Sequence, residues 1–230
     1  MSRKSLKTVF LDTLPVLTGY LFLGAGFGIL LSQHGYGFIW AFAMAVVVFA
    51  GSGQYLAVSL LSGGASILSA AIATFLVNAR HIFYGISLID PYTGAGKKKP
   101  YMIFALTDET YALVTQNEPP EGMSRHNYCF FVSLFDHIYW ILGCSLGHLA
   151  GSYLPINFEG VEFVLTALFV TMFVEQWIAH KNHLPAIIGV SCTAVCLAIF
   201  GSQLFLIPSM ALMASLLILM KKTGRREHNA

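Results

Sequence analysis

The sequence predicts an all-α, polytopic helical membrane protein with roughly six to eight membrane segments. Of its 230 residues, 56% are hydrophobic and only 10% are charged, and the mean hydropathy is +0.69. A soluble domain carries about one quarter charged residues, so this balance argues against one. Several windows of about 20 residues hold almost no charge, as a membrane-crossing helix requires. Their apolar runs are continuous rather than alternating, which argues against a barrel.

One membrane domain, 1–230, is expected to occupy the whole chain, because no polar stretch is long enough to form a soluble core. The basic N-terminus followed by an apolar run resembles a signal peptide. The run continues to Leu31 and further spans follow it, so we expect an uncleaved helix. The expected parts are a first helical half (8–89), a polar middle (90–127), a second helical half (128–220) and a basic cytoplasmic tail (221–230). The expected helical segments lie near 8–31, 38–60, 65–89, 128–150, 161–179, 183–200 and 202–220.

Several classes of function lack support in the sequence. The net charge of +2 is too small to suggest nucleic-acid binding. Neither a phosphate loop nor a dinucleotide fingerprint nor a nucleophile elbow is present, so we expect no enzyme and no cofactor. The groups Glu175, His180 and His183 do not complete a four-ligand spacing, so no metal site is expected. The cysteines lie in or beside apolar segments and are interpreted as small packing residues: Cys129, Cys144, Cys192 and Cys196.

Basic residues indicate the orientation of the chain, because cytoplasmic loops collect Lys and Arg. They gather at the N-terminus, at 97–99 and in the C-terminal tail, which predicts that both termini are cytoplasmic. Three full crossings within 8–89 would then place 97–99 on the wrong side. Two alternatives remove this conflict: either 38–60 enters the membrane and returns, or a segment within 101–117 also enters it.

Glycine spacing predicts close helix packing and suggests a two-fold internal repeat. Gly24 and Gly28 form one pair of small residues four apart, and Gly143 and Gly147 form another. Such pairs let helix backbones approach each other in a membrane. The surrounding stretches, FLGAGFG and ILGCSLG, fit a transporter built from repeated halves with a glycine-broken segment. Chance similarity between glycine-rich helices is the alternative.

The stretch FAGSGQ, residues 49–54, is predicted to interrupt a membrane helix, because two glycines and a serine lie together there. An interrupted helix presents N–H groups at one break and carbonyl groups at the other, which can hold the charges of a zwitterion. A kink that serves only packing is the alternative. The candidate substrate-binding residues of this stretch are Phe49, Ala50, Gly51, Ser52, Gly53 and Gln54.

A second polar group lies in the apolar stretch FLVNARHIFYG, residues 75–85. If 65–89 is one helix, Asn78, Arg80 and His81 form a polar strip and are candidate substrate-binding residues. An arginine inside a membrane needs an anion. The alternative is an arginine that snorkels to headgroups or water. The candidate anions are Asp108, Glu109 and Asp136.

Two acidic stretches are candidates for proton coupling. TDETYAL, 107–113, is typical of a helix start with Thr107 as N-cap, and a carboxylate there in a partly dry setting can carry a proton. SLFDHIYW, 133–140, adds an aspartate and a histidine, the side chain that titrates nearest neutrality. Structural salt bridges are the alternative for both. The proton-coupling candidates are Asp108, Glu109, Asp136 and His137.

Together these stretches resemble the AzlC family, the large subunit of branched-chain amino acid exporters. The resemblance covers roughly residues 10 to 220 and rests on FGILLSQHGYG, FAGSGQYLAVSLLSGGA, NARHIFYGISL, TDETYAL and FVLTALFVTMFVEQW, in this order. It implies export of valine, leucine or isoleucine across a bacterial inner membrane, driven by an ion gradient, with a small membrane partner of the AzlD type. The family-like positions are 49–54, Asn78, Arg80, His81 and 107–109. Ala79 and 175–176 depart from the family pattern, which leaves the exact substrate open.

The predicted function is therefore a secondary transporter that exports small neutral, branched-chain amino acids and is coupled to the proton gradient. Its expected partners are the amino acid, protons, the AzlD-type subunit and the lipid bilayer. A channel-like pore and a non-transporting subunit of a membrane complex are the alternatives.

Overall fold

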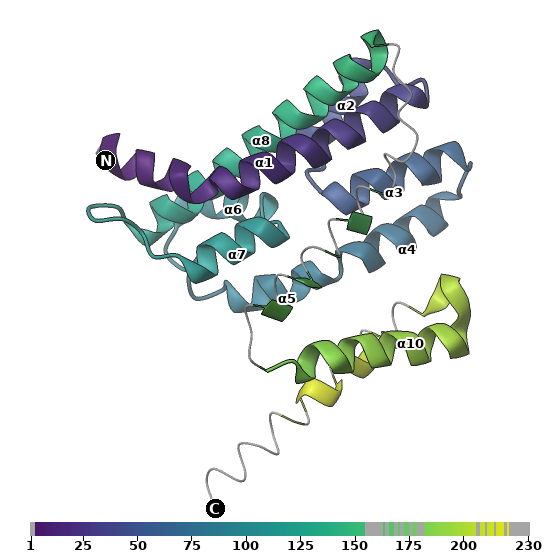
Figure 1. The fold of residues 1–230 in the computed structure, drawn as a ribbon. Helices are drawn as coiled ribbons and strands as arrows, with labels where there is room; N and C mark the ends of the chain where they lie inside the picture. The colour runs from purple at the N-terminus through teal and green to yellow at the C-terminus, as the bar shows by residue number, and fades with distance from the viewer. Residues whose placement is uncertain are drawn as a thin grey trace, which may run out of the picture. The chain divides into compact units, whose positions relative to one another are not determined.

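The computed structural model forms two compact units, Met1–Thr166 and Ala167–Ala230, and each is treated by itself. All regular elements that it describes are helical, as predicted (Figure 1). They are α1 (Arg3–Gln33), α2 (Phe38–Val47), α3 (Gly51–Ser62), α4 (Ile67–Asn78), α5 (Arg80–Ser87), η1 (Gly96–Lys98), α6 (Lys99–Phe104), α7 (Asp108–Gln116), α8 (Arg125–Tyr153) and α10 (Leu184–Leu204). The structure describes residues 3–154, 163, 166–167, 170, 173–174, 177–178, 182–205, 208–209, 211–213, 215–218 and 220.

Helices α1 and α8 lie side by side and run in the same direction (Figure 1). In the first half of α1, the hydroxyl of Thr13 lies 3.0 Å from that of Tyr139 on α8. Toward the end of α1, Ser32 Oγ lies 2.9 Å from Ser152 Oγ. The residue numbers of both helices increase from the first contact to the second, so the two helices are parallel.

Glycines bring the backbones of α1 and α8 together. A Cβ atom placed on Gly24 would lie 2.9 Å from the backbone nitrogen of Cys144, and one on Gly143 would lie 2.5 Å from a carbonyl oxygen of α1. Gly28 and Gly147 lie closer still to the opposite backbone. Any larger residue would push the helices apart, so the packing role predicted for these glycine pairs is confirmed.

Helices α2 and α3 form a hairpin against this pair. At the start of α2, the ring centroid of Phe38 lies 5.8 Å from that of His148. Near its end, the carbonyl oxygen of Ala45 lies 3.2 Å from Nε2 of His137, so α2 runs antiparallel to α8 and stops partway along it. Helix α3 then turns back, and Tyr55 Oη donates a hydrogen bond of 2.8 Å to a carbonyl oxygen of α1.

The turn of this hairpin lies at the predicted interruption, 49–54. Phe49 has a φ of 41°, in the left-handed region that residues other than glycine rarely adopt. The irregular backbone is shorter than predicted, because α3 begins at Gly51. Residues 51–54 therefore form the first turn of a helix, and their N–H groups lie at its start.

The single helix expected over 65–89 is instead two helices, α4 and α5, bent by 44°. The bend falls at Asn78–Ala79, directly before Arg80. The imidazole Nδ1 of His81 lies 3.0 Å from the carbonyl oxygen of Asn78, so the ring can satisfy a carbonyl group near the break. The uninterrupted helix expected over 65–89 is therefore wrong, and Asn78, Arg80 and His81 lie at the bend between its two parts.

Helices α6 and α7 form a second hairpin at the other end of the α1–α8 pair. Lys98, just before α6, bonds to Asn127 near the start of α8. Helix α7 returns to the same end, where Arg125 Nη1 donates to the carbonyl oxygen of Asn117 at 2.6 Å. Thr107 Oγ1 accepts from the backbone N–H of Thr110 at 3.2 Å, so the predicted N-cap is confirmed.

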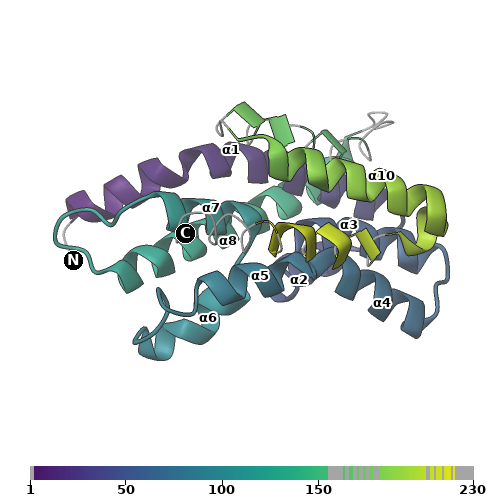
Figure 2. The same cartoon turned by 90° about the horizontal axis from the view of Figure 1, so that it is seen from below.

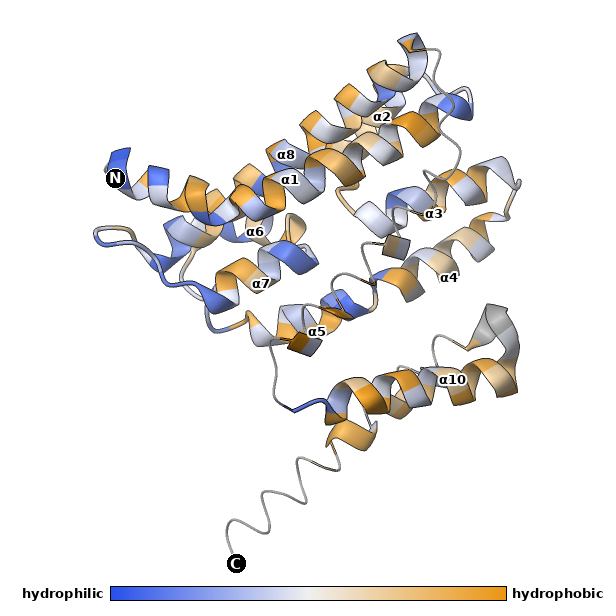
Figure 3. Ribbon diagram, in the orientation of Figure 1, coloured by the Kyte–Doolittle hydropathy of each residue, from blue (hydrophilic) through white to orange (hydrophobic). Residues whose placement is uncertain are grey.

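Three helices in the described part of the chain are long and apolar enough to cross a membrane: 3–33, 125–153 and 184–201. The bent pair α4–α5 would be a fourth. Figure 3 shows the apolar character of these helices and the hydrophilic residues at the start of α1 and between α7 and α8. The expected count of six to eight is not found among the described residues. The expected tail and parts of 161–179 and 202–220 lie outside them.

Candidate functional site

The tips of the two hairpins meet against the α1–α8 pair. In Figure 2, α6 and α7 lie toward the start of α1, and α2 and α3 lie toward its end. The ring centroid of Phe49, in the turn between α2 and α3, lies 6.4 Å from that of Phe104 at the end of α6. Phe49 also stacks on His137 of α8, at 4.3 Å, and lies edge-on to Tyr20 of α1, at 6.4 Å. We call these four aromatic residues the tip junction.

Arg80, at the start of α5, joins three helix ends beside the tip junction. Its Nη1 lies 2.7 Å from Asp108 Oδ2, and its Nη2 donates to Ser52 Oγ at 3.2 Å. The side chain of Asp108 is only 9% exposed and that of Arg80 is 30% exposed, so the pair is largely withdrawn from solvent. Among the three predicted anions, the salt bridge in the described region is made by Asp108.

Asn78 approaches α3 at Gly53, the residue after the Ser52 that Arg80 contacts. A Cβ atom on Gly53 would lie 3.4 Å from Nδ2 of Asn78, so α3 and α4 are close to van der Waals contact here. Nδ2 itself donates to the carbonyl oxygen of Thr74 at 2.9 Å. His81 bonds to the backbone at the α4–α5 bend and packs edge-on to Tyr84. Of the predicted strip, Arg80 alone makes an ion pair in the described structure.

Gln54, at the start of α3, is fully buried against α8. Its Oε1 accepts from Trp140 Nε1 at 2.8 Å and from the backbone N–H of Ala50 at 3.2 Å. Its Nε2 has no hydrogen-bond partner among the described residues. Gly51 lies under the same indole, because a Cβ on it would come within 3.2 Å of Trp140. This contact fixes the first turn of α3, and sequence reasoning missed Trp140.

A line of hydroxyl groups connects two of the predicted carboxylates. Tyr20 Oη donates to Glu109 Oε2 at 2.7 Å and lies 2.6 Å from Thr107 Oγ1. Thr107 Oγ1 lies 3.0 Å from Thr110 Oγ1, which donates to Asp136 Oδ2 at 2.7 Å. Asp136 and Thr110 are fully buried, and Asp136 Oδ1 has no partner among the described residues. Sequence reasoning missed Tyr20 and Thr110.

His137 is adjacent to Asp136 in the chain but joins a different group of contacts. Its Nε2 lies 3.2 Å from the carbonyl oxygen of Ala45, and its Nδ1 lies 3.0 Å from Tyr101 Oη. Both ring nitrogens are therefore occupied, one by each hairpin. This arrangement suits a residue that holds the two hairpin tips against α8.

The whole site lies within residues 15–154, which match the family model described as AzlC protein. The chain belongs to the AzlC family. The two tips, the Arg80 ion pair and the line of hydroxyl groups thus all belong to the AzlC region, and the predicted resemblance is confirmed. No solved structure matches the chain significantly.

Several relatives resemble this AzlC-family chain over most of its length. The branched-chain amino acid transport protein AzlC of Bacillus subtilis (strain 168) is 38% identical over 216 residues, which cover 94% of this chain and 85% of that protein. An uncharacterized membrane protein of Helicobacter pylori (strain ATCC 700392 / 26695) is 41% identical over 219 residues, covering 95% and 96%. The inner membrane protein YgaZ of Escherichia coli (strain K12) is 26% identical over 207 residues, covering 86% and 81%. With its apolar helices, the chain is a multi-pass membrane protein.

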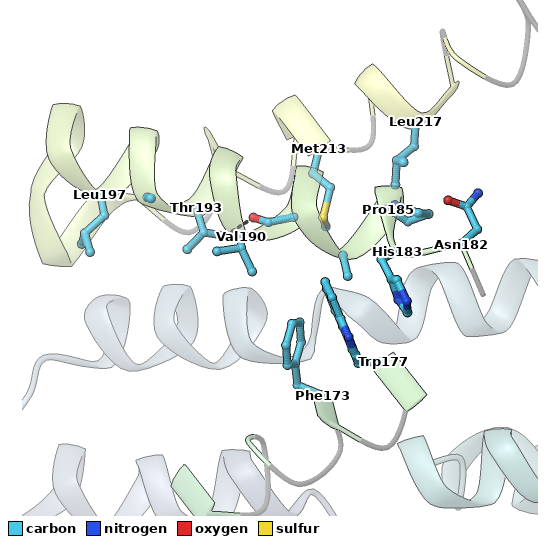
Figure 4. Close-up of a pocket in the computed structure, with 13 residues that line it drawn as sticks. Phe173, Trp177, Asn182, His183, Pro185, Val190, Thr193, Leu197, Met213 and Leu217 are labelled. Carbon is cyan, nitrogen blue, oxygen red and sulfur yellow. Dashed lines mark hydrogen bonds between the residues drawn. The ribbon is translucent and has the colours of Figure 1, made fainter. Parts of the chain in front are cut away.

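A cavity of about 820 Å³ lies beyond the residues matched by the AzlC model, within the second unit (Figure 4). The ring of Trp177 stacks on His183 at 4.1 Å in its lining, and Met213 and Leu217, which follow α10 in the chain, also line it. None of the predicted site residues lines this cavity, and the described residues of its lining include no carboxylate or arginine.

Proposed function

We propose that this chain is a secondary transporter that exports branched-chain amino acids across the bacterial inner membrane. The similarity to the branched-chain amino acid transport protein of Bacillus subtilis supports the substrate class. The observation that carries the proposal is the ion pair of Arg80 and Asp108, which lies beside the tip junction and is bridged to the start of α3 by Ser52. Burying ionisable residues within a membrane costs free energy, so we expect these two residues to be there for a function.

The geometry offers each part of an amino acid a partner. Arg80 supplies positive charge for the carboxylate, in a planar form suited to two contacts. Asp108 Oδ1 is buried and has no hydrogen-bond partner among the described residues, and we propose that it accepts a hydrogen bond from the ammonium group. The aliphatic side chain would then pack on Phe49 and Phe104. The N–H groups of residues 51–53 add neutral donors at the start of α3.

In the proposed membrane placement, both hairpins are re-entrant. Helices α2 and α3 hold 10 and 12 residues, about 15 and 18 Å at 1.5 Å per residue. A bilayer core is about 30 Å thick, so each reaches roughly its middle. The end of the α1–α8 pair with α6 and α7 carries the basic residues and is proposed to be cytoplasmic. With the segments expected at 161–179 and 202–220, the architecture reaches eight membrane elements.

Proton coupling and a partner complete the proposal. Export is driven by the proton gradient, with the proton carried among the carboxylates Asp108, Glu109 and Asp136, while His137 holds the tips. A small AzlD-type membrane subunit assembles with the chain. Both termini are placed in the cytoplasm, in keeping with the basic residues of the N-terminus and of the tail.

Transport by everted membrane vesicles tests this function, because export appears there as uptake. We expect vesicles with the chain and its small partner to accumulate labelled leucine, valine or isoleucine, and an uncoupler to abolish the accumulation. Arg80→Gln removes a charge-assisted contact and should lower initial uptake by roughly tenfold or more. Lys97→Gln removes an exposed basic residue and serves as the matched control.

Two outcomes would replace the proposal. Flux that equilibrates leucine without accumulation, and that an uncoupler leaves unchanged, would indicate a channel-like pore. Lack of flux, both with the chain alone and with the small partner, would indicate a non-transporting subunit. Uptake by Arg80→Gln equal to that of the control would remove Arg80 from the site.

A further inference from the structure

The line of hydroxyl groups between Glu109 and Asp136 has one proton fewer than it has oxygen–oxygen contacts. It contains four oxygen–oxygen contacts, of 2.7, 2.6, 3.0 and 2.7 Å, each short enough for a hydrogen bond. The three hydroxyl groups of Tyr20, Thr107 and Thr110 supply one proton each. With both carboxylates ionised, one contact therefore has no proton, and two oxygen atoms face each other unbonded.

One additional proton satisfies all four contacts at once. If it resides on Glu109, each hydroxyl group donates toward Asp136. If it resides on Asp136, each hydroxyl group donates toward Glu109. Burial favours the same state, because Asp136 is fully buried and an ionised carboxylate there would have a single described hydrogen bond.

We propose that Tyr20, Thr107 and Thr110 form a proton relay that holds one proton shared between Glu109 and Asp136 and passes it between them. In transfer toward Asp136, the proton leaves Glu109 Oε2 for Tyr20 Oη, whose own proton passes to Thr107 Oγ1. The proton of Thr107 passes to Thr110 Oγ1, and that of Thr110 to Asp136 Oδ2. One O–H bond is broken at Glu109 and one forms at Asp136, while Tyr20, Thr107 and Thr110 each lose one proton and gain another. The net result is the movement of one proton, after which the three hydroxyl groups donate toward Glu109.

The relay couples the core of the protein to the substrate site. Glu109 follows Asp108 directly on α7, so the relay begins next to the Arg80 ion pair. The remaining titratable groups that surround it are Tyr84 on α5, Tyr101 on α6, and His137 and Tyr139 on α8. Tyr101 bonds to His137, and Tyr139 bonds to Thr13, so these hydroxyl groups serve contacts outside the relay.

This inference rests on the proposed function, and its transport test compares two modes of flux. In everted vesicles with the small partner, net uptake of labelled leucine driven by a proton gradient requires the proton to move, whereas exchange of leucine for leucine does not. Thr110→Val keeps the shape of a fully buried side chain and removes its hydroxyl group. We expect this variant and Tyr20→Phe to lower the ratio of net uptake to exchange by about tenfold or more.

Two further variants separate a relay from a loss of packing. Thr110→Ser restores the hydroxyl group and should recover the ratio. Thr13→Val removes another fully buried threonine hydroxyl group between α1 and α8, one that bonds to Tyr139 and not to the relay, and should leave the ratio unchanged. An unchanged ratio in both Thr110→Val and Tyr20→Phe would overturn the relay.

Infrared spectroscopy tests the shared proton without any transport. At neutral pH, we expect the purified complex to show the C=O stretch of a protonated carboxylic acid, and the Glu109→Gln/Asp136→Asn double variant to lack it. A wild-type spectrum without this band would overturn the relay even if leucine is transported. A band that disappears in the double variant, in a complex that moves no leucine, would support the relay and overturn the proposed substrate.

Discussion

Arg80 makes contacts that a lysine could not reproduce. Two of its terminal nitrogens reach separate helices, one to Asp108 on α7 and one to Ser52 on α3. A planar guanidinium group spreads its donors in this way, whereas an ammonium group is a single point of charge. The N-cap Thr107 fixes the start of α7 and thereby the direction of the Asp108 side chain. The partner of Arg80 is thus selected by local helix geometry.

Removal of the negative charge alone should be worse than removal of both charges. Asp108→Asn leaves the guanidinium group in a half-buried site without its carboxylate, while Arg80→Gln/Asp108→Asn leaves two neutral amides. We expect the single variant to have the lower melting temperature in detergent, measured by thermal unfolding of the purified protein. A double variant less stable than Asp108→Asn would show that the two charges do not compensate each other.

At the scale of elements, the sequence predicted those helix boundaries that depend on a single short stretch of chain. The glycine-rich stretch predicted the turn between α2 and α3, and TDETYAL predicted the start of α7 at its N-cap. The bend between α4 and α5 was missed, because no proline or glycine occurs at Asn78–Ala79 to indicate it. Directly after the bend, Arg80 contacts α7 and α3, and a local sequence pattern does not contain such contacts.

The missed site residues have the same explanation. In the sequence, nothing distinguishes Tyr20, Thr110 and Trp140 from other residues of their helices. Helical periodicity tells which residues share a face, but it does not tell which face of another helix they meet. Tyr20 lies 87 residues from Thr107 in the chain, and Trp140 lies 86 residues from Gln54. The need of a tyrosine or tryptophan to bond its polar atom within a membrane is a signal that could have found Tyr20 and Trp140, but not Thr110.

The glycine contacts between α1 and α8 give a prediction with an internal control. Gly28→Ala places a Cβ against the backbone of Cys144 and His148 and should destabilise the protein by about 1 to 3 kcal/mol. Gly19→Ala makes the same chemical change in the same helix, where no atom lies within 4 Å, and should be neutral or stabilising. Thermal unfolding in detergent measures both. Equal melting temperatures for the two variants would contradict the packing role of Gly28.

At the scale of the first unit, the parallel direction of α1 and α8 bears on the orientation of the chain. Both helices start at the end where the basic residues lie, including Lys4, Lys98 and Arg125. Sequence reasoning left two ways to bring 97–99 to this side, and the folded chain contains a hairpin at each of the two places. If α2 and α3 enter and return, α4 and α5 cross back, and the conflict over 97–99 disappears.

Thiol labelling tests this arrangement on a favourable background, because the four native cysteines are all buried. Ser62→Cys, at the end of α3, and Lys97→Cys, before α6, are both at exposed positions. A membrane-impermeant maleimide should label the first in intact cells and the second in everted vesicles only. Labelling of Lys97→Cys from outside would place the α6–α7 end on the opposite side of the membrane.

The glycine contacts also bear on how such a protein can move. A transporter opens its site to each side of the membrane in turn. Packed helices can contribute to such a change by sliding a small distance past each other while their interfacial side chains adjust. Between α1 and α8 the backbones touch at successive glycines, so along this part of the interface the glycines provide no side chains that could adjust. We expect the two helices to remain a single rigid body throughout the cycle. The opening and closing would then fall to the half-length helices on either side, with the two tips acting as opposed gates.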